Sequence, residues 1–355
     1  MEPKDKSIEE YLNALFEAAQ QKQLQPSDKV VIFSDLHLGD GGKKDDFRKN
    51  ADLFISALRE YYLPGQFLLI LNGDIEEYQK FLPFQVRRAW EPVFLLFEEF
   101  SRQGKLIQIW GNHDELLSLR PGRKGRETHE AYRLLYKGKY IFIFHGHQTL
   151  PSFHRMNKVF GLVIRYLARP LGIMNGSVAR DNKKKFKTEQ KVYEYSTRKK
   201  ILSIIGHTHR PLFESLSKMD VLKFRIESLC RRYPEAGPSE KELIAEEVKQ
   251  LKQHLQQLLD SESEESLRGS IYESHFMVPS VFNSGSATGT GGITCLEIQE
   301  GHILLVHWVD EERGAHHLHS GNEQVLPIGK LGNFRIILKE ESLDYVFARI
   351  GLLGG

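Results

Sequence analysis

The stretch SDLHLGD (residues 34–40) follows the apolar run VVIF (residues 30–33) and places Asp35 and His37 two positions apart. Side chains alternate along an extended strand, so residues i and i+2 point the same way where the strand ends. A carboxylate and an imidazole that converge on one point suit a divalent metal ion. By itself, an Asp-x-His pattern is short enough to arise by chance.

Four further β-rich runs end in glycine and in residue types that bind metals. They are LLILNGD (68–74), IQIWGNHD (107–114), IFIFHGH (141–147) and ILSIIGHTHRP (201–211). Chance rarely repeats one construction in this way along a chain. The sequence therefore predicts five strands, each with candidate ligands in the turn that follows it.

Taken together, the five motifs resemble the signature of the calcineurin-like metallophosphoesterases, which reads D-x-H, G-D, G-N-H-D/E, a lone H, and G-H-x-H. The match covers roughly residues 28–212 and resumes at NSGS, residues 283–286. The resemblance implies two sets of metal ligands that share Asp74: Asp35, His37 and His209 for one ion, and Asn112, His145 and His207 for the other.

These residue types suit such a centre chemically. A shared carboxylate, here Asp74, offsets the repulsion between two cations. Mixed nitrogen and oxygen ligands favour a transition metal over Ca²⁺ or Mg²⁺, so we expect two divalent ions of Mn, or of Fe, Zn or Co. Such a pair, about 3.5–4 Å apart, lowers the pKa of a bridging water and clamps the oxygens of an in-line displacement at phosphorus. The resemblance thus implies hydrolysis by a hydroxide that bridges the ions.

Three residues beside the implied ligands are candidates for other roles. His113 is expected to give a proton to the leaving oxygen or to neutralise the phosphoryl group. Asp114 is expected to accept a hydrogen bond from His113 and to orient its ring. His147 faces the metals, the substrate or only a carbonyl group, and the sequence leaves these alternatives open.

The pattern between the motifs predicts the fold class. Helical periodicity at residues 45–62 and 79–103 alternates with the first three strands, as in layered α/β proteins. With the resemblance, we expect a four-layer α/β/β/α sandwich with helical insertions. The predicted domains are an N-terminal helix at 1–27 and one phosphoesterase domain at 28–355, with insertions at about 151–200 and 212–275.

The composition is ordinary for a globular protein, with 40% hydrophobic and 27% charged residues in 355 and a formal net charge of +2. No signal peptide or run of transmembrane length is evident. The two cysteines lie outside the motifs and lack metal-type spacing. A cytoplasmic location is expected.

Residues 151–200 carry thirteen Lys or Arg against three Asp or Glu, with apolar residues at helical spacing. Three interpretations remain open: a packed helix with a solvated cationic face, a lid over a phosphate-containing or lipid-linked substrate, and a nucleic-acid surface. Few aromatic residues are interleaved with the charges, so nucleic acid is the least favoured. The candidate substrate contacts are His147, Arg155, Lys158, Arg165 and Arg210.

The basic insertion also resembles the one in phosphoesterases that cleave UDP-2,3-diacylglucosamine, which likewise precedes an H-T-H-R-P motif. This chain differs from them at His113 and His147, where those enzymes commonly carry Arg and Asp. The resemblance implies a nucleotide-linked or lipid-linked diphosphate and peripheral contact with the inner face of a membrane.

The remaining segments suggest less about function. Residues 241–260 carry a short heptad stripe, which either packs on its own domain or forms a homodimer. NSGS at 283–286 is either a phosphate-approaching turn or an ordinary loop. Residues 293–309 predict a hairpin at a sheet edge, and the tail predicts a strand and a short helix.

Our leading hypothesis from the sequence is a binuclear phosphoesterase that hydrolyses a phosphodiester or diphosphate bond. A non-catalytic scaffold that acts through protein contacts is the main alternative, although such scaffolds tend to lose metal ligands. A nuclease is a further alternative, and it requires salt-dependent binding to DNA or RNA.

Overall fold

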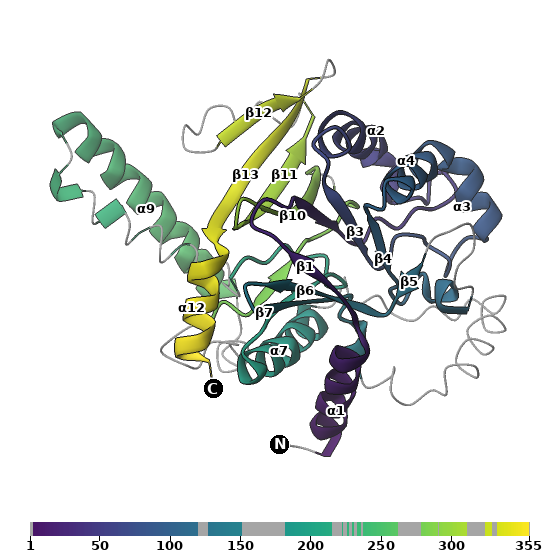
Figure 1. Ribbon diagram of the computed structural model, residues 1–355. Coiled ribbons are helices and arrows are strands. Elements are labelled where there is room, and N and C mark those ends of the chain that lie inside the picture. The colour runs from purple at the N-terminus through teal and green to yellow at the C-terminus, as the bar shows by residue number, and fades with distance from the viewer. Residues whose placement is uncertain are drawn as a thin grey trace.

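Two β-sheets, each with helices on its outer face, form the body of the molecule (Figure 1). The computed structural model describes residues 3–119, 127–150, 182–214, 237–261, 278–289, 291–310, 324–328 and 332–354, with short pieces at 222, 226, 229–230 and 233–235. All statements below concern these residues.

The larger sheet has eight strands in the order β12-β13-β11-β10-β2-β3-β4-β5. Strands β2 to β5 are parallel, and β10 joins them by pairing antiparallel with β2. The bounds are β2 Val30–Phe33, β3 Leu68–Asn72, β4 Leu106–Ile109, β5 Thr128–His129, β10 Ile293–Gln299, β11 His302–Val309, β12 Gln324–Ile328 and β13 Asn333–Ser342. The predicted hairpin β10-β11 is present, but it lies inside the sheet because β13 and β12 continue beyond it.

The smaller sheet has five strands in the order β1-β6-β7-β8-β9. Their bounds are β1 Gln20–Leu24, β6 Ala131–Tyr136, β7 Lys139–Phe144, β8 Leu202–Ile205 and β9 Val281–Asn283. Sequence analysis predicted only a helix before residue 28, whereas helix α1 (Pro3–Ala18) is followed by strand β1. The strand has the sequence QQKQL and buries only Leu24, so it has no apolar alternation to reveal it.

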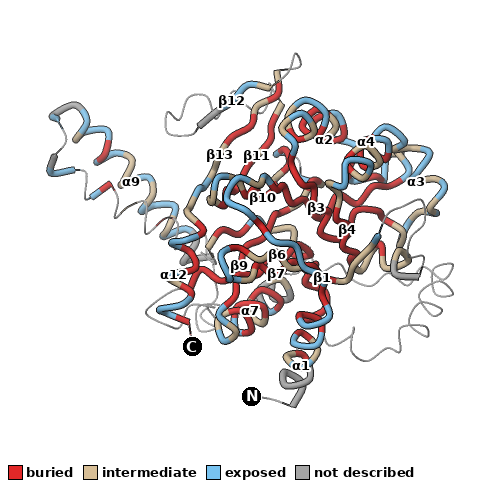
Figure 2. The backbone as a smooth tube through the Cα atoms, viewed as in Figure 1, coloured by how far each residue is buried: buried red, intermediate tan, exposed pale blue. Residues whose placement is uncertain are grey.

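Strand β2 shows how the layers are separated, because its side chains alternate between two apolar clusters. Val31 and Phe33 belong to the cluster that includes Phe54 and Phe97 from the helices over the larger sheet. Val30 and Ile32 belong to the cluster that includes residues of the smaller sheet. Figure 2 shows the buried strands of both sheets, in red, at the centre of the molecule. The predicted four-layer α/β/β/α fold is confirmed.

The outer layers are short helices. Over the larger sheet lie α2 (Ala51–Ser56), which continues from the 3₁₀ turn Phe47–Asn50 into the π-helical turn Ala57–Tyr62, and then α3 (Pro83–Ala89) and α4 (Glu91–Arg102). Helices α1, α7 (Asn182–Lys199) and α12 (Leu343–Leu353) lie over the smaller sheet (Figure 1). The further 3₁₀ turns are Glu115–Leu119, His147–Thr149 and Tyr233–Glu235.

Helix α9 (Pro238–Ser261) projects from the body (Figure 1). It contains the predicted heptad stripe, of which Ile244 is 4% exposed, whereas its neighbour Leu243 is 72% exposed. The helix is therefore confirmed. Its part in a dimer stays a prediction.

Candidate metal centre

The five predicted motif strands are all present, and they divide between the two sheets. Strands β2, β3 and β4 belong to the larger sheet, and β7 and β8 belong to the smaller one. Each is followed at once by its candidate ligands, so the ligands gather where the carboxyl ends of the two sets of strands meet. Asp35, His37, Asp74 and Asn112 follow strands of the larger sheet, and His145, His207 and His209 follow strands of the smaller sheet.

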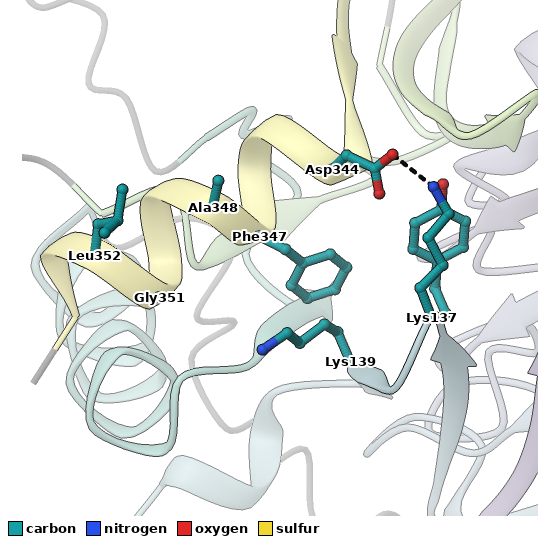
Figure 3. Close-up of a pocket in the computed structure, with 8 residues that line it drawn as sticks. Lys137, Lys139, Asp344, Phe347, Ala348, Gly351 and Leu352 are labelled. Carbon is teal, nitrogen blue, oxygen red and sulfur yellow. Dashed lines mark hydrogen bonds and ion pairs between the residues drawn. The ribbon is translucent and has the colours of Figure 1, made fainter.

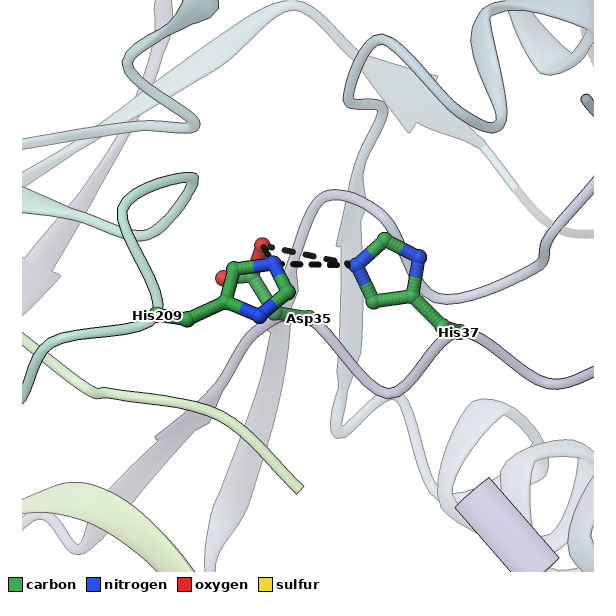
Figure 4. Close-up of side chains that lie close together, drawn as sticks. All are labelled: Asp35, His37 and His209. Carbon is green, nitrogen blue, oxygen red and sulfur yellow. Dashed lines mark hydrogen bonds and ion pairs between the residues drawn. The ribbon is translucent and has the colours of Figure 1, made fainter. Parts of the chain in front are cut away.

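One cluster consists of Asp35, His37 and His209 (Figure 4). One ligand atom from each residue lies within 4.8 Å of the other two. Nε2 of His209 is 3.1 Å from Oδ1 of Asp35 and 3.1 Å from Nε2 of His37. Two imidazole nitrogens and a carboxylate oxygen therefore point at one small volume, as metal ligands do.

A second cluster consists of Asp74, His145 and His207. Oδ2 of Asp74 is 3.1 Å from Nε2 of His145 and 4.0 Å from Nε2 of His37, which belongs to the first cluster. Asp74 thus also reaches the first cluster, and it forms a further group with His37 and His113. The segment that carries Asn112 is held beside them, because the backbone N–H of His113 donates to Oδ1 of Asp74 at 2.7 Å.

The backbone at the ligands is strained. Five candidate ligands have φ between 51° and 65°, in the left-handed region: Asp35, His37, Asp74, His207 and His209. Such a conformation costs a residue other than glycine about 1–3 kcal/mol, and it persists only where the surroundings enforce it. Gly73 has φ 81°, and a β-carbon there would lie 2.5 Å from Nδ1 of His145. The strained backbone of these turns therefore brings the ligands together.

The carboxylates of the two clusters are charged although they are buried. Burial raises the pKa of Asp35, but the neighbouring His209 and His145 lower it more, to about 2. Burial likewise raises the pKa of Asp74, but His145 and His113 hold it well below its usual range. Conversely, burial lowers the pKa of His145, but the Asp74 carboxylate raises it more, to about 9. The buried anions therefore favour a cation beside them.

His207 has the properties of a ligand. Its Nε2 is buried and has no hydrogen-bond partner among the described residues. Burial and the neighbouring His145 lower the pKa of His207 to about 3, so the ring is neutral and keeps a free lone pair. Together with the carboxylates and the other imidazoles, this donor set fits divalent transition metals.

The sequence profile described as Calcineurin-like phosphoesterase matches residues 28–233, more than half of the chain. The chain belongs to the calcineurin-like phosphoesterase family. It is therefore a hydrolase that acts on phosphoric esters, and its family implies divalent metal ions. The sequence matches no curated protein.

Among solved structures, the phosphoesterase YfcE from E. coli aligns with 89% of this chain and 99% of its own, at 11% identity and a TM-score of 0.35. A likeness of this degree carries no further argument. Within the described residues, no helix is long and apolar enough to cross a membrane.

Glu77 is a site residue of this phosphoesterase that sequence analysis missed. Its carboxylate oxygens lie 2.8 and 2.9 Å from Nδ1 of His113, and one of them lies 3.2 Å from Nδ1 of His37. Burial raises the pKa of Glu77, but its hydrogen bonds with these two histidines lower it well below its usual range. One charged side chain thus orients both rings. The available signal was an acidic residue three positions after Asp74.

Asp114 does not take the predicted place beside the His113 ring. Its Oδ1 accepts from the backbone N–H of Gly111 at 2.5 Å, and its Oδ2 accepts from that of Ile75 at 2.8 Å. The contact expected of Asp114 is made by Glu77. Burial and the charge of Asp74 raise the pKa of Asp114 to about 6. Asp114 instead joins the turns that follow β3 and β4.

Of the five residues predicted to contact substrate, the structure describes two, His147 and Arg210. His147 begins a 3₁₀ turn, is buried, and has its ring centroid 5.5 Å from that of His145. Arg210 forms a bidentate contact with Glu189 of α7. Neither observation assigns a substrate. The others lie outside the described residues: Arg155, Lys158 and Arg165.

The NSGS turn supports the site from the smaller sheet. Nδ2 of Asn283 donates to the carbonyl of Gly206 at 2.9 Å and to Oγ1 of Thr208 at 3.0 Å. Ser284 and Ser34 join their hydroxyls at 2.7 Å, next to Asp35. Of the two interpretations, the turn is therefore an ordered part of the site, and its contact with phosphate stays a prediction.

A separate open pocket of about 370 Å³ lies between α12 and the β6-β7 hairpin (Figure 3). Lys137 and Asp344 form an ion pair at its edge, with Nζ and Oδ2 2.6 Å apart. None of the candidate site residues lines it. The metal clusters, and not this pocket, are therefore the candidate active site.

Proposed function

We propose that this phosphoesterase binds two divalent ions and hydrolyses a phosphodiester or diphosphate bond. The position of Asp74 carries the proposal: its carboxylate lies between Nε2 of His145 and Nε2 of His37, which belong to different clusters. Asp35, His37 and His209 would hold one ion and Asn112, His145 and His207 the other. Asp74 would serve both.

When bound, such a pair of ions supplies an activated water and offsets the charge of the phosphate oxygens. The protein itself supplies His113. Burial lowers the pKa of His113, but Asp74 and Glu77 raise it above its usual value. With Nδ1 held by Glu77 and Nε2 3.9 Å from Oδ2 of Asp74, the ring presents a proton at the edge of the metal clusters. We propose that this proton meets the leaving oxygen or the phosphoryl group.

Manganese is our first choice of metal, with iron, zinc and cobalt as alternatives. Imidazole nitrogens bind all of these ions, whereas Ca²⁺ and Mg²⁺ prefer sites made only of oxygen ligands. The histidines that converge on the two clusters therefore favour a transition metal over Ca²⁺ or Mg²⁺.

For the substrate, we propose a nucleotide-linked or lipid-linked diphosphate resembling UDP-diacylglucosamine. The support is the basic composition of residues 151–200 and the contact of helix α7, within this segment, with Arg210 beside the candidate ligand His209. In this proposal Arg155, Lys158, Arg165 and His147 contact phosphates, and the enzyme works at the inner face of a membrane.

The decisive experiment measures Mn²⁺-dependent hydrolysis of three substrates: an aryl phosphodiester, a nucleotide diphosphate sugar, and its diacylated counterpart. Wild-type protein is compared with Asp74→Asn and with Asp52→Asn, which changes an exposed acid on α2. We expect Asp74→Asn to lose hydrolysis of every substrate and Asp52→Asn to keep it.

The outcomes separate mechanism from substrate. Full activity of Asp74→Asn would refute the shared metal centre. Preference for the diacylated compound would support a lipid-binding lid. Equal or faster hydrolysis of the aryl diester would retain the phosphoesterase but refute lipid recognition by residues 151–200.

A further inference from the structure

Glu189 is a buried carboxylate on α7 whose two oxygens are both engaged. Its relative exposure is 1%. Oε1 accepts from Oγ1 of Thr208 at 2.8 Å and from Nε of Arg210 at 3.2 Å, and Oε2 accepts from Nη2 of Arg210. A carboxylate is costly to bury unless it is paired in this way. Glu189 is therefore fixed relative to the turn that carries Thr208 and Arg210.

That turn holds two of the candidate metal ligands. Thr208 lies between His207 and His209, and Arg210 follows His209. Both histidines have left-handed backbone, with φ of 65° and 56°. A conformation of this kind persists only where neighbouring groups enforce it. Glu189 binds the residues on either side of His209.

Thr208 links Glu189 to a second support. Its hydroxyl donates to Glu189 and accepts from Nδ2 of Asn283, which also binds the carbonyl of Gly206. The turn is thus hydrogen-bonded to α7 through Glu189 and to the end of β9 through Asn283. Without the Glu189 contact, only the β9 support would remain on the Thr208 hydroxyl.

Helix α7 is itself anchored at its other end. Oη of Tyr195 donates to the carbonyl of Leu12 in α1 at 3.1 Å, and Thr197 shares a hydrogen bond of 3.0 Å with Ser280. The helix occupies the last part of the basic insertion. It therefore holds Glu189 in place against the turn at residues 206–210.

We propose that Glu189 is a positioning residue, which sets the geometry of His207 and His209 for metal binding. This inference rests on the proposed binuclear function. Because His207 and His209 are assigned to different ions, Glu189 acts on both metal sites together.

The test is calorimetric titration of the metal-free full-length protein with Mn²⁺, which requires no substrate. Glu189→Gln removes the charge, and Thr208→Val removes the hydroxyl at nearly constant volume. We expect each variant to bind both Mn²⁺ equivalents about 10–100-fold more weakly, the usual effect of losing a group that orients a metal ligand.

Two variants serve as controls. Thr208→Ser keeps the hydroxyl and should retain wild-type affinity. Glu194→Gln makes the same substitution at an exposed residue of the same helix, whose carboxylate accepts a hydrogen bond from Gln190, and it should also retain wild-type affinity. Circular dichroism of each metal-free variant checks that it is folded, and Thr208→Val replaces Glu189→Gln as the decisive variant if the latter fails to fold.

The results distinguish the two proposals. If wild-type protein binds two Mn²⁺ and the Glu189 and Thr208→Val variants bind them equally well, the positioning role is refuted but the proposed function stands. If Glu194→Gln weakens binding as much as Glu189→Gln, a specific role of Glu189 is likewise refuted. If wild-type protein binds no Mn²⁺, the proposed function fails first.

Discussion

Glu77 holds the ring of His113 through both carboxylate oxygens, which lie 2.8 and 2.9 Å from Nδ1. The same carboxylate reaches Nδ1 of His37, a candidate ligand. The orientation of the proposed proton donor and that of a metal ligand therefore depend on one side chain.

Replacing Glu77 with Gln should lower kcat about 10–100-fold, because the charge that orients both rings is lost. Steady-state kinetics with a generic phosphodiester measure this effect. Asp46→Asn is the matched control, since Asp46 is the other acidic partner of Lys80, is exposed, and has no place in the site. Wild-type kcat in Glu77→Gln would show that His113 needs no such support.

Gly111→Ala should destroy the metal centre. A β-carbon at this position would lie 2.2 Å from Oδ1 of Asp74, so the shared carboxylate would have to move. We expect loss of Mn²⁺ binding and a loss of stability of about 1–3 kcal/mol, as for other overpacked buried sites. Metal analysis and denaturant unfolding measure the two effects.

Gly237 provides the comparison for Gly111, because an added β-carbon there meets nothing within 4 Å. Gly237→Ala should keep both metal content and stability. Normal Mn²⁺ binding by Gly111→Ala would mean that Asp74 can shift without cost to the site.

Removing metal should lower the thermal stability of the protein. Buried, charged Asp35 and Asp74 lie within 4 Å of imidazole nitrogens and favour a cation. Mn²⁺ at a hundred times its Kd would stabilise the fold by about 2.7 kcal/mol per site, so we expect Tm to rise by roughly 5 °C.

Differential scanning fluorimetry of chelated and Mn²⁺-loaded protein measures this difference. Asp74→Asn should abolish most of the rise, whereas Mg²⁺ should produce a smaller one because its preferred ligands are oxygens. Identical Tm values with and without Mn²⁺ would contradict a metal site at these residues.

Arg335→Met should reduce stability without changing the chemistry. Arg335 is 4% exposed and forms a bidentate pair with the fully buried Glu297, at 2.9 and 2.6 Å. Removing the cation leaves a buried charge, which typically costs about 3–5 kcal/mol. Urea unfolding should detect that loss, while kcat at low temperature stays normal.

An exposed ion pair gives the contrast. Arg102 is 70% exposed on its side chain, and its pair with Glu99 should contribute only about 0–1 kcal/mol. Arg102→Met should therefore unfold almost as the wild type does. If Arg335→Met loses no more free energy of unfolding than Arg102→Met does, the pair of Arg335 with Glu297 does not contribute to stability.

The sequence identified strands well where apolar runs ended in ligand types. β2, β3, β4, β7 and β8 all appear where the motifs placed them, because burial on both faces keeps these strands mostly apolar. Strand β1 was not predicted, because an exposed edge strand needs no run of apolar residues. The division of the motif strands between two sheets depends on long-range pairing, which no local pattern records.

The metal-binding residue types of the candidate site could be predicted because they follow apolar strands. The prediction was incomplete because it could not give their hydrogen-bond partners. Asp114 was assigned to His113 because it is next in sequence, yet its carboxylate satisfies backbone amides of two turns. Glu77 meets the ring of His113, and Glu189 meets Thr208, only through folding, because 36 and 19 positions separate these pairs in the sequence.

The origin of the ligands in both sheets has a mechanical consequence. In the proposed centre, each ion takes ligands from the larger and the smaller sheet. The two ions therefore link the two sheets of the sandwich to each other. The apolar layer packed between the sheets then holds the two sets of ligands at a fixed distance from each other. Sliding of one sheet against the other would disturb both coordination spheres at once.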